Sequence, residues 1–382
     1  MPRAAYFDNN GTTALHPKVL QAMLPYLSEQ QGNATSRHMY GRSARNAIDQ
    51  AREQVADAVG AHPSQVIFTS SGTEADNLAI TGVANALGNG RIAVSCLEHP
   101  AVSRPAEALR WHGWILDRIA SNRHGQVEKN ALEAILQNKT DMVSVMLANN
   151  ETGVIQDVAG LGELARKHKA YMHTDAVQAL GKMDVDFASL NVHAMSLSSH
   201  KINGPQGAGA LILDKRIDIQ PLLYGGGQER GLRSGSENIA AIVGFGAACS
   251  LAVAEARQGR TELARLREHL EQGLRRLDAV IFGAEAERLP NTSFFAFAGI
   301  EGETLVMALD KQGFAVTSGS ACSSDNTEPS HVLLAMGIQP DTARGAIRVS
   351  LGANNDIDEI NAFLQALESE LTRLRKLTAV AV

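Results

Sequence analysis

Short apolar runs of strand length alternate with helical patterns from about residue 45 to residue 215. Six runs predict strands, at residues 66–69, 91–95, 142–148, 170–173, 194–197 and 208–213. Amphipathic patterns between several of them predict helices over residues 74–87, 101–112 and 161–169. Strands that alternate with helices form crossover units, which build a largely parallel sheet with helices on both faces. The last two runs are too close for a helix between them, so we expect one of these strands to run antiparallel.

The second half of the chain has a different pattern. Residues 238–277 are mostly helical and predict a long helix that joins two lobes. Apolar runs at 292–297 and 346–351 predict a smaller α/β region, and an amphipathic helix over 356–377 follows it. The segment after Gly313 is rich in Ser and Gly, which is typical of a flexible loop.

Composition excludes several classes of protein. The 382 residues are 44% hydrophobic, carry a net charge of −6 and contain no Lys/Arg block, so we expect neither nucleic-acid binding nor a membrane-bound chain. The uncharged stretch between Glu237 and Glu255 is slightly short for a membrane span and favours a buried helix. The cysteines are few and odd in number (Cys96, Cys249 and Cys322), and no signal-peptide pattern is evident. These features predict a cytoplasmic protein without disulfides.

Polar side chains follow the predicted strands at the edge where a parallel sheet binds its ligands. Gly72 and Thr73 come at a helix start, where free backbone N–H groups can hold a phosphate. The alternative there is an ordinary capping box from Thr73 to Asp76. His99 follows the second strand and can stack on a planar cofactor or shuttle a proton. Cys96 with His99 does not complete a zinc site, because no second pair supplies the other two ligands.

Two further strand ends carry candidate functional groups. Asn149 and Asn150 follow the third strand, and Asp175 follows the fourth. An aspartate there can keep a ring nitrogen protonated, although a helix cap is the simpler alternative. One polar group at a strand end can occur by chance, but polar groups at several successive strand ends indicate a site.

Lys201 is the strongest single candidate for catalysis. It ends an apolar run directly after Ser198, Ser199 and His200. A lysine at the end of a buried strand can be partly desolvated, which makes its amine nucleophilic enough to form a Schiff base with an aldehyde cofactor. The glycine-rich run at residues 225–231 does not have the spacing of a dinucleotide-binding motif. Ser236, just before the long helix, offers another place for an anion.

Motifs along nearly the whole chain resemble those of cysteine desulfurases of the NifS/IscS type. The matching stretches are Asp8-Asn-Asn-Gly-Thr-Thr13, Thr69-Ser-Ser-Gly-Thr-Glu-Ala-Asp-Asn77, Glu98-His99-Pro100, Ala148-Asn-Asn-Glu-Thr-Gly153, His173-Thr-Asp-Ala-Val-Gln178, Ser198-Ser-His-Lys201, Gln228-Glu-Arg-Gly231 and Ser318-Gly-Ser-Ala-Cys322. The resemblance implies the type I fold of pyridoxal-phosphate (PLP) dependent transferases, in its class V aminotransferase form. It also implies a large domain of residues 15–253 and a small domain of residues 1–14 and 254–382 that carries the Cys322 loop.

The resemblance assigns cofactor roles to most of the strand-end residues. Lys201 would hold PLP, His99 would stack on its ring, Asp175 would pair with the ring nitrogen and Gln178 would meet the phenolic oxygen. The phosphate would be held by Gly72, Thr73, Ser198 and His200. Ser236 would reach the phosphate of the other subunit, which implies a homodimer.

The remaining roles concern the substrate, L-cysteine. Asn150, also beside the cofactor, and Arg348 would orient it, Arg348 through a bidentate bond to its carboxylate. The Cys322 thiolate would attack the substrate sulfur, with His99 as a candidate base, and leave a persulfide on Cys322 and alanine as product. A sulfur acceptor such as an iron–sulfur scaffold would then be a partner. The chain departs from the family pattern at Ser199, where Gly is usual, at Ser236, where Thr is usual, and at Asn33-Ala34-Thr35, which lacks the usual Pro.

Three alternative functions remain open. A selenocysteine lyase would share the whole site, whereas a class V aminotransferase would not need Cys322. A sulfur-carrier or scaffold protein with a vestigial site would use Cys322 only to accept sulfur. The complete set of Lys201, Asp175 and His99 argues against that last alternative.

Overall fold

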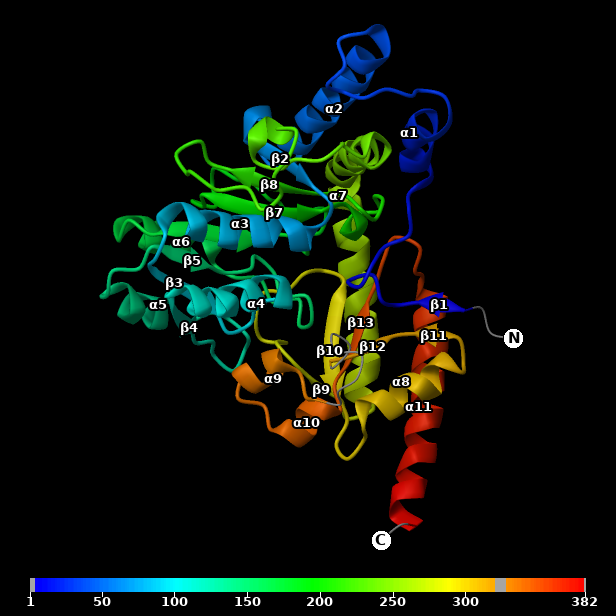
Figure 1. The fold of residues 1–382 in the computed structure, drawn as a ribbon. Coiled ribbons are helices and arrows are strands. Elements are labelled where there is room, and N and C mark those ends of the chain that lie inside the picture. The colour runs from blue at the N-terminus through cyan, green and yellow to red at the C-terminus, as the bar shows by residue number, and fades with distance from the viewer. Residues whose placement is uncertain (1–3, 320–327, 381–382) are drawn as a thin grey trace.

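The computed structural model describes residues 4–319 and 328–380, and its largest feature is a seven-stranded sheet (Figure 1). The strand order is β2-β8-β7-β6-β5-β3-β4. These strands are β2 (Val66–Thr69), β3 (Arg91–Ser95), β4 (Ile115–Ile119), β5 (Met142–Ser144), β6 (Tyr171–Asp175), β7 (Ala194–Ser198) and β8 (Gly209–Leu213). Only β8 runs antiparallel to its neighbours in this sheet. The largely parallel sheet with one antiparallel strand near its end is confirmed.

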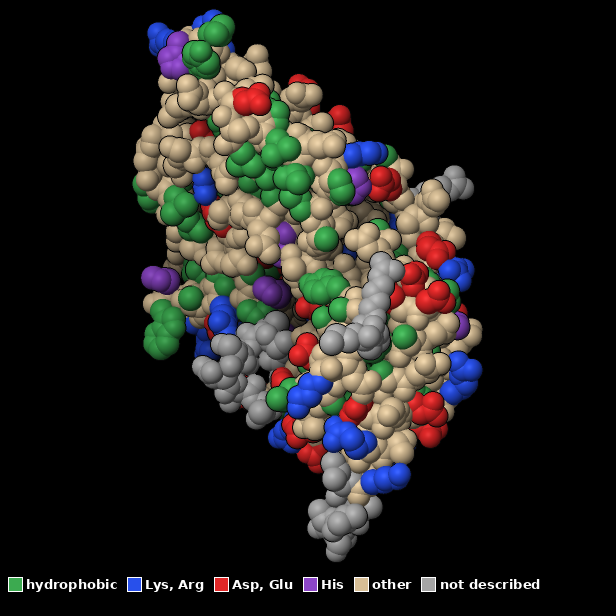
Figure 2. Space-filling view, turned by 90° about the vertical axis from the view of Figure 1, so that its right-hand side faces the viewer, with side chains coloured by type: hydrophobic (Ala, Val, Ile, Leu, Met, Phe, Trp, Pro, Cys, Tyr) green, Lys and Arg blue, Asp and Glu red, His purple; other side chains and the backbone are tan. Residues whose placement is uncertain are grey.

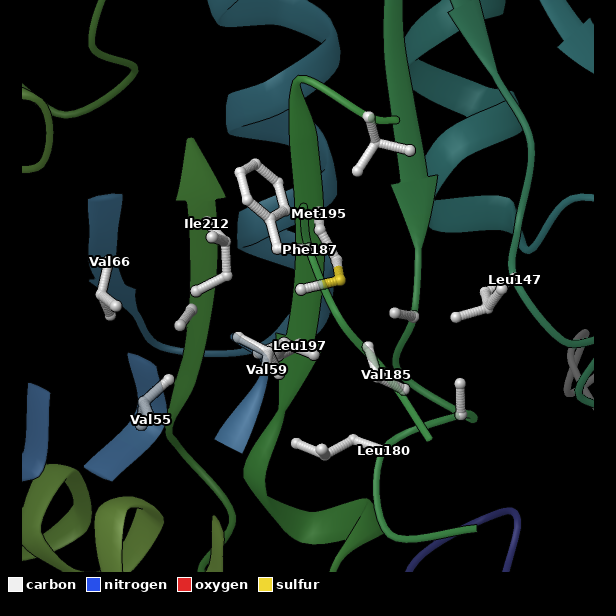
Figure 3. Close-up of a cluster of buried hydrophobic side chains, with 14 of the residues drawn as sticks. Val55, Val59, Val66, Leu147, Leu180, Val185, Phe187, Met195, Leu197 and Ile212 are labelled. Carbon is white, nitrogen blue, oxygen red and sulfur yellow. The ribbon is translucent and has the colours of Figure 1, made fainter. Parts of the chain in front are cut away.

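Helices cover both faces of this sheet because successive strand residues point to opposite sides. In β2, Ile67 packs toward α3 (Gly72–Leu87) and α4 (Pro100–Ala108), whereas Val66 and Phe68 pack toward the other face. That other face is covered by α1 (Pro17–Ser28), α2 (Met39–Ala58), α5 (Lys129–Leu136), α6 (Val158–Lys167) and the first half of α7. Figure 3 shows part of this core, where Val55 and Val59 lie near Val66, Ile212 and Leu197.

A smaller region has its own sheets and its own core. A four-stranded sheet in the order β12-β13-β10-β9 lies beside a parallel pair of β1 and β11. Its strands and helices are β1 (Ala5–Tyr6), β9 (Val280–Ile281), β10 (Thr292–Ala296), α8 (Gly302–Asp310), β11 (Phe314–Ala315), β12 (Thr317–Ser318), α9 (His331–Ala335), α10 (Pro340–Arg344), β13 (Ile347–Ser350) and α11 (Ile357–Val380). Aromatic rings fill this core, and Phe7, Phe314 and Phe363 contact one another.

Helix α7 (Ile239–Arg276) connects the two regions (Figure 1). It begins after Asn238, whose side chain accepts a hydrogen bond from the N–H of Ala241. Its first half packs on α1 and α2, and its second half contributes to the core of the smaller region with α11. The stretch Ile239–Ala256 is long and apolar enough to cross a membrane, but Phe245 and its neighbours are buried in the core. The predicted domain boundary after residue 253 falls inside α7 and remains a prediction.

The structure corrects the sequence prediction at three places. Strand β4 was not predicted, and the predicted helix 101–112 ends as α4 at Ala108 and continues as a 3-10 turn. The segment after Gly313 is not a loop throughout, because β11 pairs with β1 and β12 pairs with β13. Backbone pairing with these strands orders it despite its polar side chains. The rest of that predicted loop, including Cys322, lies outside the described residues.

Candidate functional site

A cavity of about 380 Å³ lies at the carboxyl edge of the large sheet. Ten of the predicted site residues line it: Gly72, Thr73, His99, Asn150, Asp175, Gln178, Ser198, His200, Lys201 and Arg348. Ser236 is exposed and does not line the cavity of its own chain. Cys322 is outside the described residues, but Thr317, Ser318 and Gly319, a few residues before it, lie at the cavity.

One end of the cavity is formed by the beginning of α3. Ser71 is the residue that caps this helix, and its Oγ accepts a hydrogen bond from the N–H of Glu74 at 3.1 Å. The capping box from Thr73 to Asp76 is therefore wrong, because Thr73 already lies in the first turn. The N–H groups of a first turn have no partner within the helix, so those of Gly72 and Thr73 are suited to an anion.

Close packing at this end requires glycine at position 72. A Cβ there would lie 2.7 Å from the Val177 side chain and 3.2 Å from Ser198 Cβ. The Oγ of Ser198 is buried and has no hydrogen-bond partner among the residues that the structure describes. A buried hydroxyl without a partner is unfavourable unless a ligand supplies one. His200 lies beside it, with Nδ1 at 3.0 Å from Thr12 Oγ1.

The carboxylate of Asp175 also lines this cavity. Its Oδ1 accepts a hydrogen bond from the N–H of Val177 at 2.9 Å. Burial raises the pKa of Asp175 to about 6, against the opposing effects of the Val177 N–H and the Lys201 charge. A cation here would favour the ionised carboxylate. Behind it, burial also raises the pKa of Asp76 and lowers that of His173 to about 3, so His173 is neutral.

Lys201 lines the same cavity. Its Nζ donates to the backbone oxygens of Asn10 and Gly11, both at 2.6 Å. The N-terminal segment is held there in turn, because the N–H of Thr13 donates to the backbone oxygen of His200 at 3.0 Å. The Lys201 amine is therefore held by two N-terminal residues, Asn10 and Gly11, that are distant from it in the sequence.

Arg348 lies on β13 and brings the smaller region into the site. Its Nη2 is 2.6 Å from Asp8 Oδ1, and its Nη1 donates to the backbone oxygen of Asn150 at 3.0 Å. Its Nε is buried and has no hydrogen-bond partner in the described part of the chain. The guanidinium is thus oriented by two contacts and retains donor capacity for a carboxylate.

His99 caps α4, and this contact fixes where its ring proton lies. Its Nδ1 accepts a hydrogen bond from the N–H of Ala101 at 3.1 Å. Burial lowers the pKa of His99 to about 4, and the nearby charges of Lys201, His331 and Arg104 act in the same direction. The neutral ring must therefore carry its proton on Nε2, because Nδ1 is already an acceptor.

Sequence reasoning gave no role to four residues that line the cavity: Asp8, Asn10, Asp76 and Glu151. Asp8 and Asn10 stand in a motif that was noticed, but their partners lie far away in the sequence. Asn10 Nδ2 donates to Thr292 Oγ1, and Ser330 Oγ donates to the buried Glu151. In the sequence, the signal for Glu151 and Asp76 was their closeness to the predicted site residues Asn150 and Gly72.

The described residues contain no group of three or more His, Cys, Asp and Glu side chains suited to a metal ion. The two described cysteines also differ from a reactive thiol. Cys249 is buried and burial raises the pKa of its thiol, whereas the Cys96 thiol lies 3.4 Å from Ser121 Oγ. Neither cysteine lines the cavity.

Taken by their chemistry, these groups fit one kind of ligand. The α3 start and the unpartnered Ser198 hydroxyl suit a phosphate, and the buried Asp175 carboxylate suits a protonated ring nitrogen. The Lys201 amine in the same cavity suits an aldehyde, and the Gln178 amide suits a ring oxygen.

Comparison with known proteins agrees with this chemistry. The profile of the aminotransferase class-V family matches residues 5–363. A protein named cysteine desulfurase IscS from Dictyoglomus turgidum is 41% identical, over 99% of this chain and 97% of that protein. Another of that name, from Methanosarcina thermophila, is 39% identical over 98% of this chain and 94% of that protein.

Two solved structures are similar over most of the chain. One described as a NifS-like protein has a TM-score of 0.92 and 36% identity, and the match covers 97% of this chain and 99% of that chain. Another, described as SspA in complex with cysteine, has a TM-score of 0.80 and 31% identity, with 91% and 98% covered.

Proposed function

This chain belongs to the aminotransferase class-V family, and we propose that it is a PLP-dependent cysteine desulfurase. It converts L-cysteine to L-alanine and passes the sulfur to Cys322 as a persulfide. One observation supports this most strongly: the Lys201 amine, the Asp175 carboxylate and the start of α3 line one cavity. They do so in a chain about 40% identical to proteins named cysteine desulfurase.

The cavity residues divide the binding of PLP among them. Bound PLP supplies an aldehyde and a ring that accepts electrons from the substrate carbon. Lys201 would hold the aldehyde carbon, and Asp175 would keep the ring nitrogen protonated. The N–H groups of Gly72 and Thr73, with Ser198 and His200, would hold the phosphate. His99 would contact the ring.

Substrate orientation depends on residues from both regions. Arg348 binds the carboxylate of L-cysteine, and Asn150 lies beside it. Asp8 and the backbone oxygen of Asn150 hold the guanidinium in place beforehand. The Lys201 amine would take the proton from Cα of the substrate. The neutral His99 ring can donate a hydrogen bond from Nε2–H in this arrangement, while its Nδ1 accepts from the Ala101 N–H.

The sulfur transfer needs only L-cysteine and the Cys322 thiol as reactants. The thiolate of Cys322 attacks the substrate sulfur and forms an S–S bond. The C–S bond breaks, its electron pair stays with carbon, and protonation of that carbon gives alanine. Cysteine and the Cys322 thiol thus become alanine and a Cys322 persulfide, with no further oxidant. Ser318 and Gly319 at the cavity support this role for a cysteine three residues beyond Gly319.

The decisive experiment measures alanine and persulfide after the purified protein is mixed with L-cysteine. Cys322→Ser should keep the visible colour of the cofactor and lose both products, because a hydroxyl is a poor nucleophile toward sulfur. Cys96→Ser is the matched control and should behave as wild type. A keto acid as the main product would favour an aminotransferase. A strong preference for selenocysteine over cysteine would favour a selenocysteine lyase.

The lysine assignment has its own test. Borohydride reduction of the coloured protein should fix the cofactor on the peptide that contains Lys201. Label on another lysine would contradict the assignment.

The proposed assembly is a homodimer in which Ser236 completes the site of the other subunit. Ser236 is exposed and does not line its own cavity. Leu20, Leu24 and Leu27 of α1 are exposed, and Figure 2 shows hydrophobic side chains gathered on this face over α1. An exposed apolar face of this kind is typical of a subunit contact.

A cytoplasmic location and a protein that accepts the persulfide sulfur, such as an iron–sulfur scaffold, complete the proposal.

A further inference from the structure

Lys182 is a buried lysine that the proposed reaction does not use. It lies in the turn after β6, is 8% exposed, and its Nζ donates to Gln178 Oε1 at 2.9 Å. Gly181 has a φ of +79°, a left-handed conformation that glycine adopts without strain. This bend returns the lysine amine to the side chain four residues earlier.

The contact with Lys182 determines which way the Gln178 amide points. The lysine amine has N–H donors in both its charged and its neutral form, and it donates to the carbonyl oxygen of the amide. The other end of the amide donates from Nε2 to the backbone oxygen of Asn10 at 3.0 Å. That same oxygen accepts from Lys201 at 2.6 Å. The Gln178 nitrogen therefore lies on the side of Lys201, and its oxygen lies on the side of Lys182.

This placement of a lysine is unfavourable for folding alone. Burial lowers the pKa of Lys182 to about 7, and the charges of Lys201 and Arg348 contribute in the same direction. An apolar side chain of the same length would fill the space without desolvating an amine. A buried lysine with a shifted pKa beside a ligand cavity is more typical of a functional site than of a core.

We propose that Lys182 is a positioning residue for the cofactor. It holds the Gln178 amide so that an N–H, and not a carbonyl oxygen, meets the phenolic oxygen of bound PLP. That oxygen carries negative charge, so an N–H stabilises it and a carbonyl would repel it. The inference rests on the proposed function, because it requires PLP in the cavity.

The test measures cofactor binding without turnover. Cofactor-free protein is titrated with PLP and followed by visible absorbance. Lys182→Met keeps the length of the side chain and removes the donor, so we expect roughly tenfold weaker binding, the effect of one lost hydrogen bond, and a shifted absorbance maximum. Lys182→Arg also only donates and should restore part of the affinity. Lys139→Met removes a 90% exposed lysine and should match the wild type.

A comparison in the Gln178→Leu background separates positioning from packing. Without the amide, Lys182→Met should cause no further loss of PLP affinity, because no group remains for Lys182 to orient. Losses that add in the double variant would contradict the proposal. So would a Lys182→Met protein with wild-type affinity and spectrum.

Two other outcomes are informative. If Lys182→Met does not fold, Lys182→Gln takes its place, and weaker PLP binding is again expected because an amide can present either end to Gln178. Wild-type affinity in that variant would overturn the proposal. A wild-type protein that takes up no PLP would instead overturn the proposed function and this inference with it.

Discussion

Arg52 and Glu229 lie 177 residues apart in the sequence and form a bidentate ion pair in the core, with both N–O distances at 2.7 Å. Glu229 also accepts a hydrogen bond from the N–H of Phe68 in β2, and the guanidinium lies over the Phe68 ring. Glu229 adopts a φ of +46°, which is uncommon outside glycine. The pair therefore ties the loop before α7, which carries Ser236, to the edge of the sheet.

Removal of one partner of this pair should destabilise the protein strongly. Arg52→Met leaves Glu229 buried without a cation, and we expect the free energy of unfolding to fall by about 3–5 kcal/mol. Arg52→Met with Glu229→Gln should cost less than Arg52→Met alone, because the amide still accepts from Phe68. Denaturant unfolding measures both. Loss of the exposed Arg265–Glu262 pair is the control and should leave stability unchanged.

Glu98 should make stability depend on pH in the neutral range. Burial raises its pKa from 4.5 to about 8, although the Ser95 hydroxyl and the Met146 N–H favour the ionised form. Between these two pH values the folded chain holds a proton that the unfolded chain has lost. This contribution to stability is complete below pH 4.5 and is lost as the pH rises to about 8.

Glu98→Gln removes this titration and keeps a neutral side chain of the same shape. We expect its stability, relative to the wild type, to rise by on the order of a few kcal/mol between about pH 5 and about pH 8. Denaturant unfolding of cofactor-free protein at several pH values measures the difference. Glu107→Gln, on the surface, is the control. Parallel stability curves for Glu98→Gln and wild type would contradict the expected pKa.

Arg348→Lys should raise the KM for L-cysteine by roughly 10- to 100-fold and leave the cofactor spectrum unchanged. A lysine cannot contact Asp8, Asn150 and a substrate carboxylate with the planar fork that these three partners require. Steady-state alanine formation measures KM, and absorbance reports the cofactor. Arg344→Lys on α10 is a matched control near the surface. An unchanged KM in Arg348→Lys would remove this residue from the substrate site.

Ser236→Ala should weaken PLP retention roughly tenfold or more, the effect of one lost hydrogen bond to a charged group. Mixing tests whether the serine acts across subunits. A dimer of one Ser236→Ala chain and one Lys201→Ala chain has one site with both residues intact, if each site takes Ser236 from its partner. Tight PLP binding in half of the sites of the mixed dimer is expected. Absence of this recovery would place Ser236 in the site of its own chain.

Much of the site could be predicted because it lies where strands end. His99, Asp175 and Lys201 each follow an apolar run, and the direction of parallel strands brings such ends to one edge. The resemblance then supplied roles that position alone leaves open. Contacts between distant segments could not be predicted this way. Asp8 and Arg348 are 340 residues apart, and no local pattern predicts that they pair.

The errors have physical causes of the same kind. Strand β4 lies at the edge of the sheet and is partly exposed, so it carries the charged residues Asp117 and Arg118 in its middle and does not look like an apolar run. Arg91 of β3 pairs with Asp117. Thr73 and Ser71 are both favoured capping residues by type, and only the fold decides which of them precedes the first turn. Residues 314–318 look like loop because their strand character comes from partners far along the chain.

The N-terminal segment has a consequence for the order in which the enzyme is made. Residues 4–13 leave the ribosome long before their partners do: Phe314 for Ala5, and Arg348 and Ser350 for Asp8 and Asn9. Asn10 and Gly11, which hold the Lys201 amine, are fixed in place by the same pairing. The nascent chain thus cannot complete its cofactor cavity until the region around residue 350 has emerged. Completion of the cavity therefore depends on synthesis of β13, and a ribosome-bound fragment that ends before β13 should not capture the cofactor.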